Sequence, residues 1–376
     1  MISARLSRTA FRWQMLAVFS AMSAACPALH GQLNFQFIDE DSPVPSPHSS
    51  VSPSLDAQMM AGVNKAAQRW SAAFTNHVTL SIAVKIAALP AGTIASTNWT
   101  PDFVSYSAVH SALESHAQTV AARSAIANLP NGPSFEMVTN HTSQDPSASG
   151  KTPYLDKNGS ANNSTICLTQ GDARALSLYA SSGGGPDATI TFNSTYLNRF
   201  DFDPDDGITP GDLDFVGNAT HELGHALGFT SGVDTLDFYA RGPSLNEDSL
   251  PDVSALDLFR YSSLSHSDGA GVIDWSADSR PKYFSIDGGA TPFAFFSTGE
   301  NFGDGGQASH WEQGVTRGVM DPDSDFGERL SITSADLTAL NVIGWNFSSV
   351  PEPSTYGMGA LTVLAAAAFA RRKDRR

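Results

Sequence analysis

The stretch His221-Glu222-Leu223-Gly224-His225-Ala226-Leu227-Gly228-Phe229 carries two histidines four positions apart with a glutamate between them. Positions i and i+4 lie on one face of an α-helix, so His221 and His225 can present ring nitrogens to one metal ion. Glu222 lies beside them and can accept a proton from a metal-bound water. These features predict a hydrolytic zinc site. A surface helix with two histidines is the alternative.

A hydrolytic zinc site needs a third protein ligand, and the sequence leaves its identity open. The extended pattern H-E-x-x-H-x-x-G-x-x-H places that ligand three residues after the glycine, where this chain has Ser231. Serine is a poor zinc ligand, and His266 and His310 are the only histidines that follow. Asp234 and Asp237 are further candidates, either as a ligand or as a carboxylate that orients a ligand histidine. A solvated or helix-capping carboxylate explains them equally well.

Residues around His310 resemble a known family. Trp311 follows it directly, and Gly318-Val319-Met320-Asp321-Pro322 comes shortly after. The arrangement resembles the leishmanolysin group of metzincin zinc peptidases, in which a large insertion separates the helix glycine from a third histidine that precedes a Met-turn. The resemblance covers about residues 218–322. The matching residues are His221, Glu222, His225, Gly228, His310, Trp311, Met320 and Pro322.

The resemblance implies roles for five of these residues. It makes His221, His225 and His310 the zinc ligands, Glu222 the catalytic base and Met320 the structural floor of the site. By the same resemblance His266, in a polar loop without a following Met-turn, is the weaker candidate for the third ligand. The chain departs from leishmanolysin itself in having only two cysteines and no apparent inhibitory pro-region.

The expected fold is an α+β, metzincin-like zincin with a mixed twisted sheet, an active-site helix and a smaller C-terminal subdomain. We expect a zinc metallopeptidase domain at residues 56–348, divided into 56–230 and an insertion-containing 231–348. The expected function is a secreted zinc endopeptidase that cleaves protein or peptide substrates, with Glu222 as general base. Residues 188–192 are predicted to form an edge strand that pairs with extended substrate.

Two other functions remain open. One is a surface or extracellular-matrix binding protein on a catalytically inactive zincin fold. The other is a zinc amidase or another hydrolase of non-peptide substrates. An inactive site commonly loses its base, so the presence of Glu222 favours an enzyme.

Residues 1–31 are predicted to be a secretory signal peptide. Three arginines precede an apolar segment at 15–25 that is too short to span a bilayer comfortably, and small residues follow it. Cys26 allows a lipoprotein signal as an alternative, although Ser23 stands where such a signal prefers leucine. Residues 32–55 include a Pro- and Ser-rich segment and are expected to be a flexible leader.

Residues 351–376 carry three features in order. Pro351-Glu352-Pro353 is followed by an apolar segment at 356–370 and then by Arg371-Arg372-Lys373-Asp374-Arg375-Arg376. The basic cluster marks a cytoplasmic end, so a membrane anchor is one interpretation. The order also resembles the PEP-CTERM sorting tail of Gram-negative bacteria. That resemblance implies recognition by an exosortase, transient membrane contact of the tail, and a product at the cell surface or outside the cell.

The body of the protein is strongly acidic. The chain carries 22 basic and 38 acidic residues, and without both ends 14 basic and 36 acidic residues remain, a net charge of −22. This charge argues against nucleic acid as a partner, because phosphates would be repelled. Alternating carboxylates at 201–206 and 321–325 make calcium a second candidate cation, and solvated acidic loops are the alternative.

Cys167 is the only cysteine left after removal of residues 1–31, so no disulfide within the chain is expected. We expect it to be a small buried residue. A metal ligand or an inhibitory thiol is the alternative.

Periodicity and turn residues predict the remaining elements. Helices are expected at 57–74, 106–127, 172–180, 213–228 and 334–343. Strands are expected at 78–86 and 188–192, and a hairpin at 283–286 with 292–296. Loops are expected at 139–164, 181–186 and 200–211, and 236–306 is expected to be an insertion.

Overall fold

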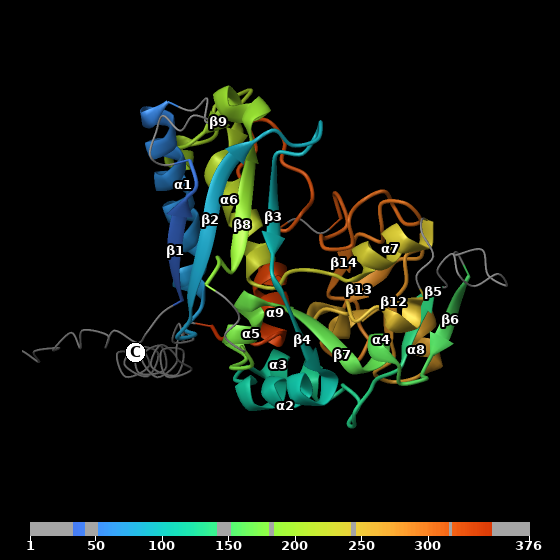
Figure 1. Cartoon of the computed structure of the whole chain (residues 1–376). Helices are drawn as coiled ribbons and strands as arrows, with labels where there is room; N and C mark the ends of the chain where they lie inside the picture. The colour runs from blue at the N-terminus through green and yellow to red at the C-terminus, as the bar shows by residue number, and fades with distance from the viewer. Residues whose placement is uncertain are drawn as a thin grey trace, which may run out of the picture. The chain divides into compact units, whose positions relative to one another are not determined.

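The computed structural model describes residues 33–41, 52–140, 152–179, 184–241, 246–315 and 318–347. These ranges combine α-helices with several small β-sheets, which confirms the predicted α+β class (Figure 1). The predicted signal peptide and sorting tail lie outside the described residues. Among the helices that are described, none has the length and apolar character needed to cross a membrane.

The largest sheet has four strands in the order β1-β2-β8-β3 (Figure 1). They are β1 (Asn34–Asp39), β2 (Thr79–Ala87), β8 (Ala188–Asn193) and β3 (Ala95–Trp99). β1, β2 and β8 are parallel and β3 is antiparallel to β8, so the sheet is mixed, as predicted. Both expected strands are present.

Two predictions about this sheet are wrong. β1 lies inside the range expected to be a flexible leader, yet it pairs with β2 from Asn34 to Asp39. β8, expected at the edge, is an inner strand because β3 pairs with its other side. The sequence of β3, Ala-Ser-Thr-Asn-Trp, lacks the alternation of apolar and polar residues that marks a strand, so its edge position could not be recognised.

Helices α1 (Pro53–Ala73) and α6 (Phe215–Ala226) pack against one another beside this sheet (Figure 1). Ser52 caps α1 by accepting a hydrogen bond from the backbone of Leu55, and Pro53 occupies the first turn, where no amide proton is needed. The buried Trp70 donates from Nε1 to the carbonyl oxygen of Thr220 at 2.9 Å. The α1 helix is therefore joined to α6 by packing and by a hydrogen bond.

The ends of α6 are fixed by specific residues. The Asp214 side chain accepts hydrogen bonds from the backbone of Gly217 at the N-terminus and of Leu330. Gly228 ends the helix with a φ of 110°, and an added Cβ would lie 3.0 Å from Ile343 Cδ1 and 3.1 Å from Asp172 Cβ. Because only glycine adopts this conformation without strain, Gly228 turns the chain sharply away from the helix.

Asp172 in α5 (Gln170–Ala175) is a buried acid behind this turn, and the helix begins two residues before the predicted position. Its Oδ1 has no hydrogen-bond partner within the described ranges. Burial raises the pKa of Asp172 well above its ordinary value, because the charged form loses its hydration.

We expect the Asp172→Asn variant to be more stable than the parent at neutral pH. The unfolded chain ionises near pH 4, so the parent loses stability as the pH rises from there through the raised pKa of the folded state. The variant has no carboxylate to ionise, so its free energy of unfolding should exceed that of the parent by more at pH 7 than at pH 4. Denaturant unfolding of the parent and the variant at pH 4 and at pH 7 tests this expectation. Equal pH dependence of the two proteins contradicts it.

Two smaller sheets, β4-β7 and β12-β5-β6, follow in the structure, and β5 and β12 are parallel (Figure 1). β4 (Pro101–Ser105) pairs with β7 (Thr165–Thr169), and β5 (Met137–Asn140) lies between β6 (Pro153–Asp156) and β12 (Ile273–Trp275). The short helix α4 (Ala161–Ser164) precedes β7. The loop predicted at 139–164 therefore contains a strand and a helix within its described part, while 141–151 lie outside the described residues.

The helix predicted at 106–127 is two helices, α2 (Tyr106–His116) and α3 (Val120–Ile126). The interruption has a local cause. Ala117 adopts an extended conformation, and the Thr119 side chain accepts a hydrogen bond from the backbone of Ala122. A threonine that caps a new helix competes with continuation of the first one.

The predicted insertion folds into short elements after α6. In chain order they are α7 (Val233–Arg241), η3 (Glu247–Ser249), η4 (Leu256–Phe259), β11 (Arg260–Tyr261), α8 (Ser263–Asp268), β12, β13 (Lys282–Phe284) and β14 (Ala294–Phe296). β13 and β14 are antiparallel neighbours, so the predicted hairpin is confirmed.

The remaining elements are four short ones that precede α6 in the sequence and the last helix of the chain. The loop predicted at 200–211 contains β9 (Phe200–Asp201) and η2 (Pro204–Asp206), while η1 (Ser194–Arg199) precedes it and β10 (Leu213–Asp214) follows it. The last helix, α9 (Ser334–Val342), is where the sequence predicts it. Thr333 and Asp336 cap it reciprocally, and Gly344 follows with a φ of 119°.

Candidate metal centre

Three histidine side chains meet at one point of the structure. His221 and His225 project from α6, and His310 arrives from the loop after β14. Nε2 of His221 lies 3.1 Å from Nε2 of His225 and 3.2 Å from Nε2 of His310. Two nitrogen ligands on a tetrahedral zinc ion, each about 2.0–2.1 Å from it, are about 3.3 Å apart. The donor set and its spacing therefore fit a zinc ion.

Backbone carbonyl oxygens orient two of the three rings. His221 Nδ1 lies 2.7 Å from the oxygen of Val319, and His225 Nδ1 lies 2.7 Å from the oxygen of Phe229. A ring that donates its Nδ1 proton to a carbonyl keeps the Nε2 lone pair free for a metal. His310 differs, because its buried Nδ1 has no hydrogen-bond partner in the described part of the chain.

All three rings favour the neutral state. Burial lowers the pKa of His221 to about 4 and that of His225 to about 3, and the pKa of His310 falls well below its usual value for the same reason. A neutral imidazole is the form that binds a metal ion. The site is therefore ready to bind a cation at neutral pH without first losing protons.

Glu222 lies next to the histidines in a buried position. Thr97 on strand β3 places its Oγ1 2.6 Å from Glu222 Oε2 and 3.0 Å from the Glu222 carbonyl oxygen. Burial raises the pKa of Glu222 to about 7, while the hydrogen bond from Thr97 opposes that shift. A carboxylate with a pKa near neutral pH is suited to accept and return a proton. Sequence reasoning did not identify Thr97.

Met320 lies beneath the helix at Gly224. A Cβ atom on Gly224 would lie only 2.4 Å from the sulfur of Met320, so the glycine allows the methionine to approach the helix closely. Asp336 holds this segment by accepting hydrogen bonds from the backbone of Val319 and Met320. It also accepts from Trp311 Nε1 at 2.8 Å. The segment at 318–322 also contacts the histidine group, because the Val319 carbonyl oxygen lies 2.7 Å from His221 Nδ1. The Met-turn role of Met320 stays a prediction.

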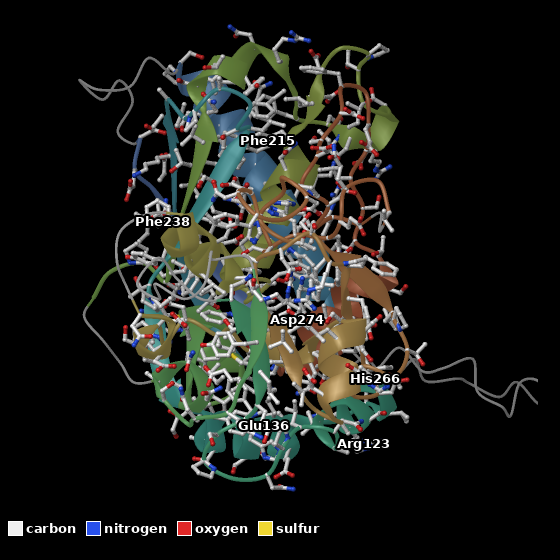
Figure 2. The ribbon with its side chains drawn as sticks, turned by 90° about the vertical axis from the view of Figure 1, so that its right-hand side faces the viewer. Arg123, Glu136, Phe215, Phe238, His266 and Asp274 are labelled. Atoms are coloured by element: carbon white, nitrogen blue, oxygen red, sulfur yellow. The ribbon has the colours of Figure 1, made fainter. Side chains whose placement is uncertain are left out.

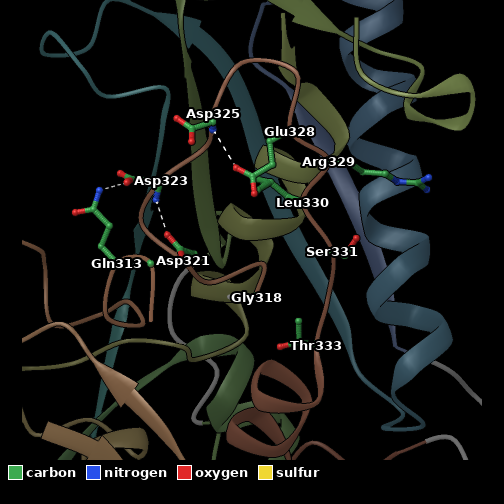
Figure 3. Close-up of a pocket in the computed structure, with 11 residues that line it drawn as sticks. Gln313, Gly318, Asp321, Asp323, Asp325, Glu328, Arg329, Leu330, Ser331 and Thr333 are labelled. Carbon is green, nitrogen blue, oxygen red and sulfur yellow. Dashed lines mark hydrogen bonds between the residues drawn. The ribbon is translucent and has the colours of Figure 1, made fainter. Parts of the chain in front are cut away.

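The histidines line a cleft of about 800 Å³. Its lining includes strand β3 with the segment before it, and Asp321 and Asp323 from the segment after Met320. The described residues of the cleft lining include no lysine or arginine. The same two aspartates also line a neighbouring cavity of about 530 Å³ together with Asp325 and Glu328 (Figure 3).

The other candidate residues lie outside the histidine group. His266 is exposed on α8, and Figure 2 shows it well away from Phe215 at the start of α6. Asp237 accepts hydrogen bonds from the backbone of Asn301 and Phe302. Asp234 lines the cleft and accepts hydrogen bonds from residues next to His310.

The sequence also offers Cys167 and the acidic loop at 201–206 as possible metal ligands. Cys167 is buried in β7, and burial raises the pKa of its thiol to about 12, so it is not a reactive thiolate. In the acidic loop at 201–206, Asp203 and Asp205 lie 3.3 Å and 2.6 Å from the Lys65 ammonium group. Calcium binding at the acidic loops stays a prediction.

Comparisons with known proteins identify only the C-terminal end of the chain. Residues 349–376 match the family model of the PEP-CTERM protein-sorting motif. The chain carries a PEP-CTERM sorting tail. This tail implies recognition by exosortase sorting machinery and export to the cell surface in Gram-negative bacteria. Searches of curated proteins and of solved structures found no match.

Proposed function

We propose that this exported protein is a zinc-dependent endopeptidase with a metzincin-like architecture, similar to the leishmanolysin group. The observation that carries the proposal is the convergence of three histidine nitrogens beside a buried glutamate in an open cleft. Met320 beneath Gly224 and the long chain segment between His225 and His310 support the same family.

Each residue of the centre has a defined part in hydrolysis. His221, His225 and His310 would hold the zinc ion. A bound zinc ion supplies Lewis-acid activation of water and of the scissile carbonyl group. Glu222 accepts the proton of the attacking water and returns it to the leaving amine. Thr97 keeps the Glu222 carboxylate in place through its hydroxyl group.

Strand β3 is the better candidate for substrate pairing. It is an outer strand of its sheet within the described ranges, and Ala95–Trp99 line the cleft beside the histidines. An extended peptide that added to this edge would pass the metal centre with its backbone hydrogen-bonded. We therefore assign to β3 the substrate-pairing role predicted for residues 188–192, because β8 already pairs with β2 on one side and with β3 on the other.

Metal removal tests the proposal directly. We expect the purified protein to cleave unfolded casein when loaded with zinc, to lose this activity in EDTA, and to recover it when zinc is restored. The physical reason is that Glu222 alone does not activate water or polarise the carbonyl group sufficiently at neutral pH. Cleavage is followed by gel electrophoresis and by release of peptides. Cleavage that is indifferent to EDTA, or zinc binding without hydrolysis of any peptide library, contradicts the proposal. The second result favours a binding protein.

A further inference from the structure

His310 is the ligand whose position is least explained by its immediate surroundings. His221 and His225 are fixed by one helix and by carbonyl oxygens at their Nδ1 atoms. His310 lies in a loop, only 8% exposed, and its Nδ1 has no hydrogen-bond partner among the residues described. Metal-ligating histidines are usually oriented through this second nitrogen. The orientation of His310 therefore depends on the backbone that carries it and on the packing of its ring against His221 and His225.

The backbone before His310 is held by Asp234 on α7. Asp234 Oδ1 accepts from the amide of Ala308 at 2.6 Å, and Oδ2 accepts from the amide of Ser309 at 3.2 Å. The Ser309 hydroxyl group donates to the same Oδ2 at 2.5 Å. A single carboxylate thus accepts three hydrogen bonds from the two residues that precede the ligand.

Ser231 completes this arrangement from the other side. Its amide donates to Ser309 Oγ at 2.9 Å across 78 residues of sequence. Asp257 fixes Ser231 in turn, by accepting from its hydroxyl group at 2.6 Å and from the amide of Gly232 at 2.8 Å. In the shorter H-E-x-x-H-x-x-G-x-x-H pattern, the position of Ser231 holds the third ligand itself. Here that position anchors the loop that brings the ligand from elsewhere.

Arg260 holds the same loop at its carbonyl side. Its guanidinium group donates to the oxygen of Ala308 at 3.4 Å and to the oxygen of Ser297 at 2.7 Å. The amide of Ser297 donates to the oxygen of His310 at 3.0 Å. The loop is therefore held on both sides of the ligand, and Asp234 and Ser309 hold the side that precedes it.

We infer that Asp234 and Ser309 are positioning residues that act as a clamp on His310 and make it a competent third metal ligand. The clamp replaces the ring hydrogen bond that orients each of the other two histidines. The inference rests on the proposed metal centre and extends it beyond the ligands. It does not require Asp234 to touch the metal ion or the substrate.

Zinc affinity of the full-length protein tests the clamp without reference to catalysis. In the Asp234→Asn variant one oxygen becomes an amide that cannot accept from Ser309, so we expect zinc binding to weaken about 10- to 100-fold. Loss of the Ser309 hydroxyl group in Ser309→Ala should weaken it in the same direction. Asp237→Asn is the matched control, because Asp237 is a buried acid on the same helix that holds residues 301–302 instead. Affinities are measured by competition with a chromophoric chelator.

A double-mutant cycle separates positioning from general loss of structure. If the clamp acts through His310, Asp234→Asn has no further effect on zinc affinity once His310 is alanine. Equal losses with and without His310, or an Asp234→Asn variant that binds zinc as the parent does, overturn the inference. A parent protein that binds no zinc overturns the proposed function and the clamp together. Circular dichroism of each metal-free variant shows whether the fold is retained.

Discussion

The Glu222→Gln variant should bind zinc as the parent does and lose nearly all peptide hydrolysis. Glutamine has almost the same shape, and its amide oxygen can still accept the hydrogen bond from Thr97. It cannot accept the proton of the attacking water. Removal of a general base costs about 10²- to 10⁴-fold, and we expect kcat/KM to fall by this amount.

The measurement that checks this expectation combines casein cleavage with zinc titration of the same preparation. Unchanged zinc affinity together with lost hydrolysis assigns Glu222 to the chemical step. Hydrolysis that survives in Glu222→Gln would mean that another group takes the proton, and the proposed mechanism would be wrong. Thr97→Val is a useful companion variant, because it removes the hydroxyl contact to Glu222 but retains the glutamate as a base.

Replacing His310 with alanine should strongly weaken zinc binding and abolish hydrolysis. With one of three nitrogen donors lost, zinc affinity should fall by at least about 100-fold, since even loss of a residue that only supports a ligand costs 10- to 100-fold. His266→Ala is the control, because His266 is exposed on α8 and lies outside the histidine group. The structure therefore predicts opposite outcomes for the two histidines that the sequence leaves as alternatives.

Zinc titration and cleavage assays on both variants check this expectation. If His266→Ala loses zinc while His310→Ala retains it, the proposed ligand set is wrong. Retention of zinc by both variants would indicate that a carboxylate in the cleft completes the centre. Asp234, which lines the cleft, would then be the first residue to examine.

The fold was predictable where local rules apply. The strands at β2 and β8 and the helix α9 follow from apolar spacing and from capping residues near their predicted positions. The predictions fail where a segment becomes a strand only because a neighbouring strand pairs with it. β1 and β3 have weak local signals, and each becomes a strand because a neighbouring strand satisfies its backbone. The break between α2 and α3 depends on the single residue Thr119.

The candidate site likewise contains some residues that the sequence predicts and others that it does not. Two histidines and a glutamate within five residues can be read directly, because the helix repeat alone places both imidazoles on one face. Residues that support the ligands carry no such signal. Thr97, Asp234 and Asp336 are separated from their partners by as many as 125 residues, so no spacing rule connects them.

The sequence by itself determined that the chain has an H-E-x-x-H helix and a sorting tail, because both are encoded by residues close together. Only the tertiary structure decided that His310, and not His266, completes the histidine group. The physical reason is that a third ligand from beyond an insertion is fixed by the loop that carries it. That loop is held by Asp234, Ser231 and Arg260 through contacts that exist only after the insertion has folded back onto α6.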